Sequence, residues 1–372
     1  MKPKVTVLLP VWNGEQYLRE AIDSILRQTF RDFEFLIIND GSTDSSRAIV
    51  ESYHDSRIRA VNHSTNLGLT RALNHGLSLV TGEYVARQDA DDISEPDRLA
   101  RQVAYLDAHR NVALVGCCYK KIGPTGEELG DRPLPTDCLD LRWALLFYDP
   151  FIHGAVMFRR ELVRNAVGRY DEAFPYVQDY DLWSRIARGL PVANLPEYLV
   201  RYRHSPTSMS NNSAYAHEAE HFRVVVNNLR EILGSAEFER LSVNPESYLV
   251  IKSLLFQSPA AFSPDAASAA VERIQTLHSA FCRYFTLDHA TAVNRVKRIN
   301  SHVAARLLDA AQTRYHQGSH AEARAFATLA SHVDRRVVAS SRNAKLRFKL
   351  LAGPTLARLG MAPKREPANR SV

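Results

Sequence analysis

Cysteine is scarce in this sequence: four occur in 372 residues, at positions 117, 118, 138 and 282. Their spacing matches no pattern of zinc ligands, and two adjacent cysteines rarely bridge each other. A fold that depends on disulfides or on a structural zinc is therefore not expected. Unpaired thiols fit a reducing compartment such as the cytoplasm.

Long hydrophobic runs are also lacking. No stretch approaches the roughly 18 consecutive apolar residues of a membrane span, although 45% of the chain is apolar, an ordinary share for a soluble protein. The apolar stretch after Met1-Lys2-Pro3-Lys4 is too short for a signal peptide. We expect a cytoplasmic protein, with peripheral contact at the cytoplasmic face of the membrane as an alternative.

Strong charge of one sign is missing as well. The formal net charge of +6 indicates a mild preference for anionic partners, and nucleotides, phospholipid headgroups and nucleic acids would all satisfy it. The basic residues are scattered and form no stripe interleaved with aromatic residues, so nucleic acid is not an expected partner.

Apolar strands alternate with helical patterns through the first 90 residues. Strands are predicted at residues 5–9, 33–38, 58–61 and 82–88, with helices between them, which is typical of a parallel, doubly wound α/β sheet. Because the carboxyl ends of parallel strands share one edge, the polar clusters that follow three of these strands should converge. These clusters are residues 10–13, 39–40 and 89–92.

The stretch at residues 82–92 is a short apolar strand that ends in Asp89, Asp91 and Asp92. Two carboxylates separated by one small residue suit a hard divalent cation, Mn²⁺ or Mg²⁺, that can also hold a diphosphate. The alternative is that these residues only precede and cap the next helix, since residues 94–97 resemble a helix start. The stretch by itself does not decide between the two.

The character of the chain changes after Ser210. Residues 214–350 are rich in Ala, Leu, Arg and Glu with almost no strand signal, and residues 304–330 read as a helical hairpin. We expect three parts: an α/β domain at residues 1–210, a helical C-terminal domain at 211–345, and a basic tail at 346–372. For the tail, a frayed terminus is favoured over a segment lying on an anionic membrane surface.

Six motifs in register resemble the family 2 glycosyltransferases, over roughly residues 4–210. They are Pro10-Val11-Trp12-Asn13-Gly14-Glu15, Gln28-Thr29-Phe30, Asn39-Asp40-Gly41-Ser42-Thr43-Asp44 followed by Asn66-Leu67-Gly68, Gly82-Glu83-Tyr84, Asp89-Ala90-Asp91-Asp92, and Gln178-Asp179-Tyr180-Asp181-Leu182-Trp183. The resemblance implies a GT-A fold, a Rossmann-like, mostly parallel sheet flanked by helices. The α-helical C-terminal region lies outside it.

The resemblance also implies roles for matching residues. Asp179 would be the catalytic base, and Asp91 would be the metal ligand with Asp89 near it or near the ribose. The remaining donor-binding positions would be Pro10, Val11, Trp12, Glu15, Asp40, Asn66, Arg71, Asp89 and Ala90. His153 and His204 are candidates for contacts to the acceptor or the diphosphate.

Each of these residues also has a purely structural interpretation. Asp40 could be a turn former, Trp12 a core residue and Arg71 a solvated helix residue. Asp179 could be a helix cap, because Asp181 is equally acidic and nearby, and either histidine could be an ordinary core or surface residue.

The expected function is a metal-dependent, inverting glycosyltransferase (a hexosyl- or hexosaminyltransferase) of cell-surface polysaccharide synthesis. It would move one sugar from a nucleotide-sugar, most commonly a UDP-sugar in this family, to a hydroxyl of a glycan or lipid-linked glycan. Single transfer is expected because the Gln-x-x-Arg-Trp motif of processive members does not follow Asp179. The neighbour of Asp179 is Gln178 where the family usually has Glu.

Two other functions remain as alternatives: a nucleotidyltransferase that makes sugar nucleotides, and a non-catalytic nucleotide-sugar-binding module. A nicotinamide-dependent oxidoreductase is not expected, because no Gly-x-Gly-x-x-Gly turn follows the first strand.

Overall fold

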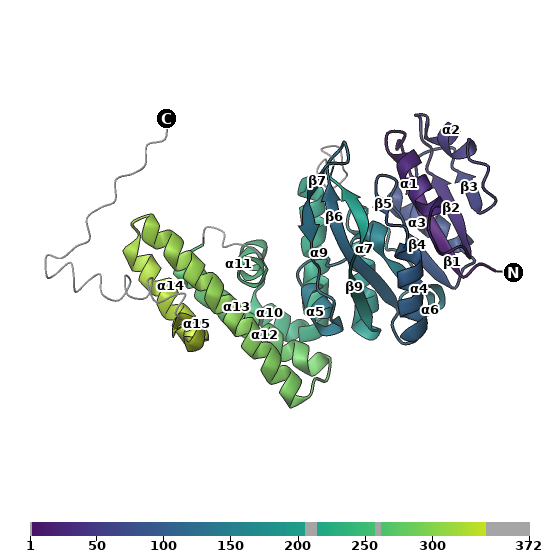
Figure 1. Cartoon of the computed structure of the whole chain (residues 1–372). Helices are drawn as coiled ribbons and strands as arrows, with labels where there is room; N and C mark the ends of the chain where they lie inside the picture. The colour runs from purple at the N-terminus through teal and green to yellow at the C-terminus, as the bar shows by residue number, and fades with distance from the viewer. Residues whose placement is uncertain (1, 205–213, 257–261, 340–372) are drawn as a thin grey trace, which may run out of the picture. The chain divides into compact units, whose positions relative to one another are not determined.

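The structure, a computed structural model, describes residues 2–204, 214–256 and 262–339. The chain forms two compact units, Met1–Asn228 and Leu229–Val372 (Figure 1). Helix α9 (Ala214–Leu233) crosses the division between them. The boundary predicted at residue 210 and the tail predicted at 346–372 both lie outside the described residues.

A mixed β-sheet forms the centre of the first unit. Within the described residues it has nine strands, in the order β3-β2-β1-β4-β8-β6-β9-β5, with β7 paired to β6. Their bounds are β1 Val5–Val11, β2 Phe33–Asn39, β3 Ile58–Asn62, β4 Tyr84–Arg87, β5 Ile93–Ser94, β6 Leu114–Ile122, β7 Glu128–Arg132, β8 Met157–Arg159 and β9 Val192–Arg203.

The first four strands are parallel, as predicted from the sequence. The three-residue strand β8 then runs antiparallel between β4 and β6, and β6 and β9 pair in parallel again. Strands β6 and β7 form an antiparallel hairpin. The fold class, an α/β sheet with flanking helices and a helical C-terminal region, is confirmed. The sheet is mixed rather than mostly parallel, because the pairs β4–β8, β5–β9, β6–β7 and β6–β8 are antiparallel.

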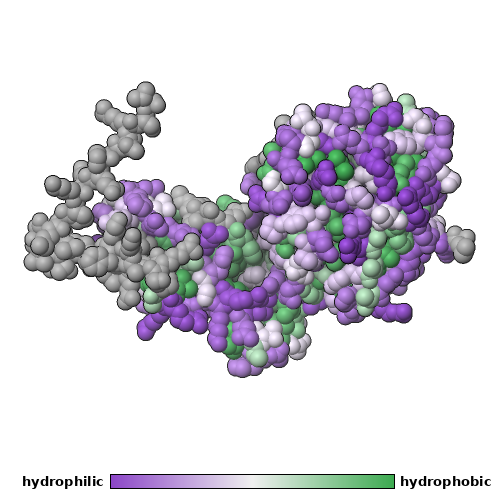
Figure 2. Space-filling view, in the orientation of Figure 1, coloured by the Kyte–Doolittle hydropathy of each residue, from purple (hydrophilic) through white to green (hydrophobic). Residues whose placement is uncertain are grey.

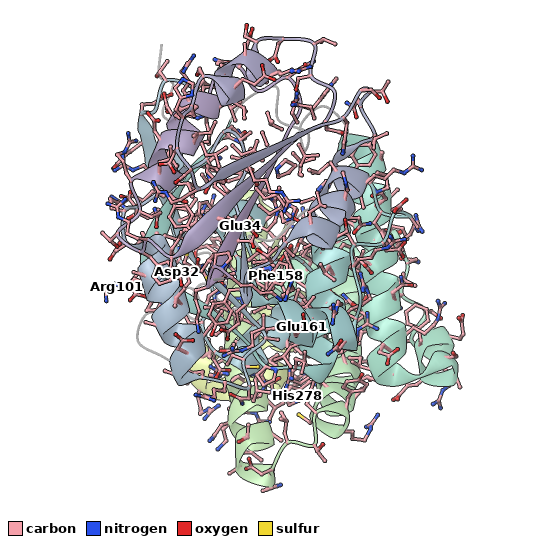
Figure 3. All side chains as sticks on the ribbon, turned by 90° about the vertical axis from the view of Figure 1, so that its right-hand side faces the viewer. Asp32, Glu34, Arg101, Phe158, Glu161 and His278 are labelled. Atoms are coloured by element: carbon pink, nitrogen blue, oxygen red, sulfur yellow. The ribbon has the colours of Figure 1, made fainter. Side chains whose placement is uncertain are left out.

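Helices cover both faces of this sheet (Figure 1). The helices of the first unit that precede α9 are α1 Leu18–Leu26, α2 Ser46–Glu51, α3 Leu69–Leu79, α4 Arg98–Ala108, α5 Cys138–Ala144, α6 Arg160–Ala166 and α7 Gln178–Gly189. The apolar core that joins alternate residues of β1 to α1 and α4 lies on one face. On the other face Leu8 packs against Gly76 of α3, and Phe158, labelled in Figure 3, lies against Trp183 of α7. Burial on both faces explains why the central strands are predominantly apolar.

Strand β1 continues two residues past the predicted end at Leu9, through Pro10. The backbone of Leu8 faces β4, accepting a hydrogen bond from the Gln88 N–H at 3.1 Å, and the pairing with β4 stops there. Proline at position 10 therefore removes an N–H that has no strand to bond.

The second unit is helical in its described residues: after α9 come α10 Ser235–Leu241, α11 Pro245–Leu255, α12 Pro264–Tyr284, α13 His289–His316, α14 His320–Val333 and α15 Arg335–Ala339. Side chains of Asn244, Ser263 and Asp288 cap α11, α12 and α13. Gly318, at φ +81°, takes the left-handed conformation that lets the chain turn from α13 into α14. The predicted hairpin at residues 304–330 is this α13–α14 pair.

Hydrophilic residues cover most of the face shown in Figure 2, with hydrophobic residues in scattered patches. In the described part of the chain, no helix is both long enough and apolar enough to span a membrane.

Candidate functional site

Two loops at the carboxyl ends of β1 and β2 are joined by side-chain hydrogen bonds. The Asn13 carboxamide oxygen accepts from the Thr43 N–H at 2.8 Å, and the Gly14 N–H donates to the Ser46 hydroxyl at 2.9 Å. The carboxylate of Glu15 accepts from the Ser45 N–H at 2.9 Å. Glu15 therefore lies at the predicted edge of the sheet, and its observed contact is structural.

Asp40 lies at the end of β2 and is 2% exposed. Its carboxylate accepts hydrogen bonds from the backbone N–H groups of Leu67, at 3.0 Å, and Gly68, at 2.9 Å, and contacts the ring of His63 at 2.7 Å. Three of about four lone-pair positions are used in this way. The turn-forming role of Asp40 is thus present, and one acceptor position is left for a ligand.

Asn66 and Arg71, which are both predicted to bind the nucleotide-sugar donor, lie at the start of α3. Asn66 is exposed and accepts from the Gly68 N–H at 2.7 Å. Arg71 is 63% exposed and pairs with Glu172 at 3.2 Å. Its guanidinium is therefore at the surface, where it can exchange one anionic partner for another.

Trp12 is 56% exposed, immediately after the buried residues Pro10 and Val11. The alternative that Trp12 is a core residue is therefore wrong. An indole presents a large apolar face, and leaving it in water is unfavourable unless something covers it.

Strand β4 ends in a buried cation that the sequence analysis did not select. Arg87 is fully buried; one guanidinium nitrogen donates to the carbonyls of Leu8 and Gln88, and the other donates to the Asp89 carboxylate at 2.7 Å. A charged residue inside an otherwise apolar strand was the signal that could have identified it.

The three carboxylates after β4 have different surroundings. Asp89 is 28% exposed and Asp91 is partly buried, whereas Asp92 is buried and accepts from the Arg203 N–H at 2.9 Å. Burial, followed by repulsion from Asp89, raises the pKa of Asp91 to about 6. Ala90 connects this loop to the end of β1, since a Cβ atom on Gly14 would lie 3.6 Å from the Cβ of Ala90.

The capping alternative for residues 89–92 is wrong. Helix α4 begins at Arg98 with Asp97 at its N-cap, and the short strand β5 (Ile93–Ser94) separates the carboxylates from it.

Asp179 lies in the first turn of α7, as predicted, and its side chain is 23% exposed. Burial and repulsion from Asp89, opposed by a hydrogen bond from the Tyr180 N–H, raise the pKa of Asp179 to about 6. Asp181 instead binds Arg185 at 2.8 Å and is buried. Of the two carboxylates, Asp179 is the one without a cationic side chain bound at hydrogen-bond distance among the described residues.

His153 lies between Arg87 and Asp179. Its Nε2 atom is 3.1 Å from Arg87 Nε and 3.0 Å from the Tyr170 hydroxyl, and its Nδ1 atom is 3.9 Å from Asp179. His204 is not part of this group: it is exposed, and its N–H donates to the Ile122 carbonyl at the end of β6.

Asp149 is a further carboxylate that sequence analysis missed, because no local pattern marks it. Its Oδ2 atom is buried and has no hydrogen-bond partner among the described residues. Burial, and then repulsion from Asp179, raises the pKa of Asp149 well above its usual value. Mutual repulsion thus links four carboxylates: Asp89, Asp91, Asp149 and Asp179. The contacts of Asp40, by comparison, are with residues of the 63–68 loop.

Within the described residues, no three His, Cys, Asp or Glu side chains are arranged to hold a metal ion by themselves. Asp89 and Asp91 can supply at most two hard oxygen ligands. A divalent cation fits this set only if other oxygens, such as those of a bound diphosphate and water, complete its shell.

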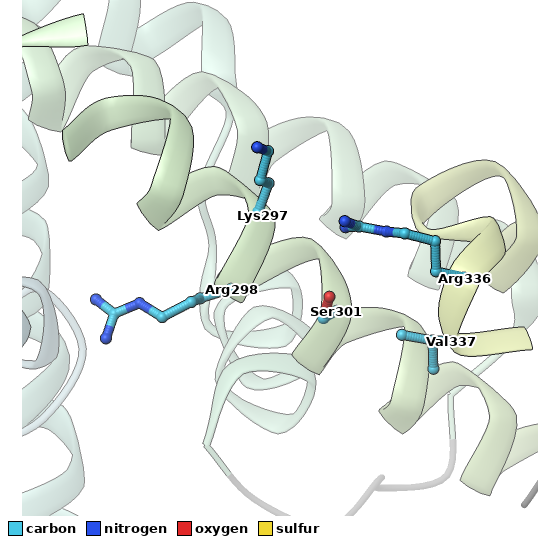
Figure 4. Close-up of a pocket in the computed structure, with 5 residues that line it drawn as sticks. All are labelled: Lys297, Arg298, Ser301, Arg336 and Val337. Carbon is cyan, nitrogen blue, oxygen red and sulfur yellow. The ribbon is translucent and has the colours of Figure 1, made fainter. Parts of the chain in front are cut away.

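A separate hollow of about 590 Å³ lies in the second unit (Figure 4). Its lining residues are Lys297, Arg298, Ser301, Arg336 and Val337. Arg336 is bound to Asp334 at 2.9 Å. None of the predicted site residues lines this hollow.

The parallel strands carry polar loops on one edge of the sheet, beside the group of carboxylates, an arrangement typical of the ligand-binding edge of an α/β enzyme. The sequence profile of glycosyl transferase family 2 matches residues 6–165. The chain belongs to glycosyltransferase family 2 and is a glycosyltransferase.

Three relatives at 35–36% identity support this assignment. A glycosyltransferase of Haemophilus influenzae is 36% identical over 228 residues, which cover 58% of this chain and 69% of that protein. Putative glycosyltransferase EpsE of Bacillus subtilis is 36% identical over 57% of this chain and 77% of its own. Amylovoran biosynthesis glycosyltransferase AmsE of Erwinia amylovora is 35% identical over 53% and 75%.

Among solved structures, Staphylococcus aureus TarS 1–349 in complex with UDP-GlcNAc has a TM-score of 0.54 at 18% identity, covering 98% of this chain and 93% of that one. The complex of the same TarS fragment with UDP has a TM-score of 0.52 at 19% identity, covering 86% and 92%. At this identity the likeness establishes the fold.

Proposed function

We propose that this enzyme is a metal-dependent, inverting glycosyltransferase that moves one sugar from a nucleotide-sugar to a hydroxyl group of a glycan or lipid-linked glycan. The observation that carries the proposal is the placement of Asp179, a partly accessible carboxylate with a raised pKa, in the same electrostatic group as Asp89 and Asp91. A base is thereby available beside the loop that would hold the donor.

The donor would lie along the edge formed by β2, β1 and β4. Trp12 supplies an exposed aromatic face next to Pro10 and Val11 for a nucleobase, and Asp40 retains one acceptor position for a base N–H. Ala90 would line the same wall, and Asn66 and Arg71 would approach from the start of α3. The UDP and UDP-GlcNAc in the TarS structures favour a UDP-sugar.

A divalent cation, Mn²⁺ or Mg²⁺, would be held by Asp91, with Asp89 beside it. Burial, and then repulsion from Asp89, raises the pKa of Asp91, and a bound cation would offset that repulsion, so these oxygen ligands suit a divalent cation. When bound, the cation would neutralise charge on the leaving diphosphate.

Asp179 would take the proton of the acceptor hydroxyl as that oxygen attacks the anomeric carbon from the face opposite the nucleotide. A single displacement of this kind inverts the anomeric centre. The neutral side chain of Gln178 beside Asp179 adds no further negative charge. AmsE is named for the biosynthesis of amylovoran, which favours a role for this chain in polysaccharide synthesis.

The test begins with a panel of nucleotide sugars, screened with Mn²⁺ by thermal shift for the donor that stabilises the protein. With that donor and an acceptor, Asp179→Asn and Asp91→Asn should each lower turnover by roughly 10²- to 10⁴-fold. Asp131→Asn, an exposed carboxylate on β7, is the matched control and should be unchanged. The anomeric configuration of the product, read by NMR, should be opposite to that of the donor.

Retained turnover in either site variant would remove the role assigned to that residue. Formation of a nucleotide-sugar from a nucleoside triphosphate and a sugar 1-phosphate, with release of diphosphate and without an acceptor, would instead identify a nucleotidyltransferase. Binding of the donor without hydrolysis or transfer to any acceptor would identify a binding module.

A further inference from the structure

The buried guanidinium of Arg87 connects two carboxylates of the site through a histidine. One terminal nitrogen binds Asp89 at 2.7 Å, and the Nε–H group donates to His153 Nε2 at 3.1 Å. The opposite ring nitrogen, Nδ1, faces Asp179 Oδ2 at 3.9 Å. The order Asp89–Arg87–His153–Asp179 therefore runs from the end of β4 to the start of α7.

The contact with Arg87 determines which ring nitrogen of His153 carries the proton. A guanidinium has donors and no acceptor, so Nε2 must offer its lone pair. Burial, and then the charge of Arg87, lowers the pKa of His153 well below its usual value, so the ring is neutral. A neutral ring that accepts at Nε2 is protonated at Nδ1, the nitrogen that faces Asp179.

The ring is also held in place by its neighbours. The Tyr170 hydroxyl lies 3.0 Å from Nε2, and the indole of Trp183 packs edge-on against the imidazole with centroids 6.1 Å apart. The 3.9 Å between Nδ1 and Asp179 exceeds a hydrogen bond. Catalytic hydrogen bonds in unliganded enzymes are often long and shorten in the reacting complex.

We propose that His153 is a positioning residue that presents an Nδ1–H to the carboxylate of Asp179, and that Arg87 maintains the tautomer that allows it. The proposal rests on the proposed role of Asp179 as base. His153 stays neutral throughout: the proton removed from the acceptor hydroxyl ends on the carboxylate, and the Nδ1–H only orients that carboxylate. The groups that face this pair are Arg87 and Asp89 at the end of β4, Asp149 after α5, and Tyr170 before α7.

The tautomer can be measured on the full-length enzyme. With ¹⁵N-labelled histidine, and His153→Asn used to assign the signal, the ring nitrogens of His153 should report a neutral ring protonated at Nδ1 near pH 7. A ring protonated at Nε2, or a charged ring, would overturn the proposal whatever the role of Asp179.

Two substitutions of His153 distinguish the contribution of Nδ1 from that of Nε2. In His153→Asn, the amide nitrogen lies near the position of Nδ1 and can still donate to Asp179. In His153→Gln, the longer side chain places its oxygen near the position of Nε2, where it can accept from Arg87 but leaves no donor for Asp179. His153→Gln should lower kcat by roughly 10- to 100-fold with KM for the donor nearly unchanged. His153→Asn should retain most of kcat.

The pH dependence of kcat/KM is a measurement that would not change if the role of His153 were only structural. A hydrogen bond to the ionised carboxylate favours ionisation, so its loss in His153→Gln should move the acid limb of kcat/KM to higher pH, and His153→Asn should keep the limb near that of the parent enzyme. Equal losses in both variants with an unmoved limb would refute the positioning role. Asp179→Asn distinguishes the two proposals. If this variant retains turnover, the assignment of Asp179 as the base fails. If it is inactive while both histidine variants behave alike, only the positioning role of His153 fails.

Discussion

The carboxylate of Asp92 accepts a hydrogen bond from the backbone N–H of Arg203 at 2.9 Å, joining residues 111 positions apart. The Arg203 guanidinium in turn donates to the backbone carbonyl of Asp91 at 2.9 Å. Strand β9 thus holds the loop after β4 by its backbone and by Asp92. The side chain of Asp91 takes no part in these two contacts, which fits the metal-binding role proposed for it; the two adjacent carboxylates would then have separate tasks.

Substitutions of Asp92 should therefore affect mainly the stability of the protein, and substitutions of Asp91 mainly its binding of metal and donor. Asp92→Asn keeps an oxygen that can accept from Arg203, and we expect its stability to change by no more than about 1 kcal/mol. Asp92→Ala leaves the buried N–H of Arg203 unsatisfied and should lower the free energy of unfolding by about 1–3 kcal/mol. Urea denaturation measures both. Asp91→Asn should fold normally but lose Mn²⁺-dependent thermal stabilisation by the donor, and a normal donor response would contradict the division of tasks.

Gly154 should not tolerate a side chain. A Cβ atom there would lie 2.8 Å from Asp89 Oδ2 and 2.9 Å from Asp92 Oδ2, so Gly154→Ala must displace both carboxylates. We expect a loss of about 1–3 kcal/mol in stability and weaker donor binding by isothermal titration. Gly189→Ala, where nothing lies within 4 Å of the added atom, is the control, and similar losses in both would mean that crowding at the carboxylates is not the cause.

Activity should fall in acid. The pKa of Asp179 is raised to about 6 in the folded protein, and a base works only when deprotonated. At saturating Mn²⁺, kcat/KM should be level above about pH 7 and fall about tenfold per pH unit below about 6. A profile that stays level down to pH 5 would argue against Asp179 as the titrating base.

The same raised pKa has a consequence for stability. For a carboxyl group whose pKa is higher in the folded than in the unfolded state, the folded state binds more protons between the two values, so stability is lost as pH rises through that window. For Asp179 the window runs from 3.8 to about 6. Without metal, Asp179→Asn should be more stable than the parent by about 1–3 kcal/mol at pH 7, and the gain should shrink at pH 5. A gain that does not depend on pH would have another origin.

Trp12 should contribute to donor binding rather than to stability, because its indole is 56% exposed. Stacking on a base is worth about 1–3 kcal/mol, so Trp12→Ala should raise the Kd for UDP about 10- to 100-fold with little change in Tm. Trp12→Phe keeps an aromatic face and should recover most of the affinity. An unchanged Kd in Trp12→Ala would place the nucleobase elsewhere.

The order of strands and helices was predictable because each buried strand carries its own apolar run. Residues 5–9 and 33–38 are apolar except for Thr6 and Glu34, and a strand covered on both faces needs a largely apolar composition. The antiparallel insertion of strand β8 (Met157–Arg159) between β4 and β6 depends instead on pairing between distant segments. The extension of β1 through Pro10 likewise depended on where β4 stops.

By itself, the sequence determined the alternating α/β pattern, the helical C-terminal region, and the motifs at Asp40, Asp89, Asp91 and Asp179, because these depend on residue types at short spacing. Only the tertiary structure decided that Arg87 lies between Asp89 and His153, that Asp181 is occupied by Arg185, and that Asp149 is buried near Asp179. The physical reason is that burial and electrostatic partnership arise between segments far apart in the chain, and no local pattern records them.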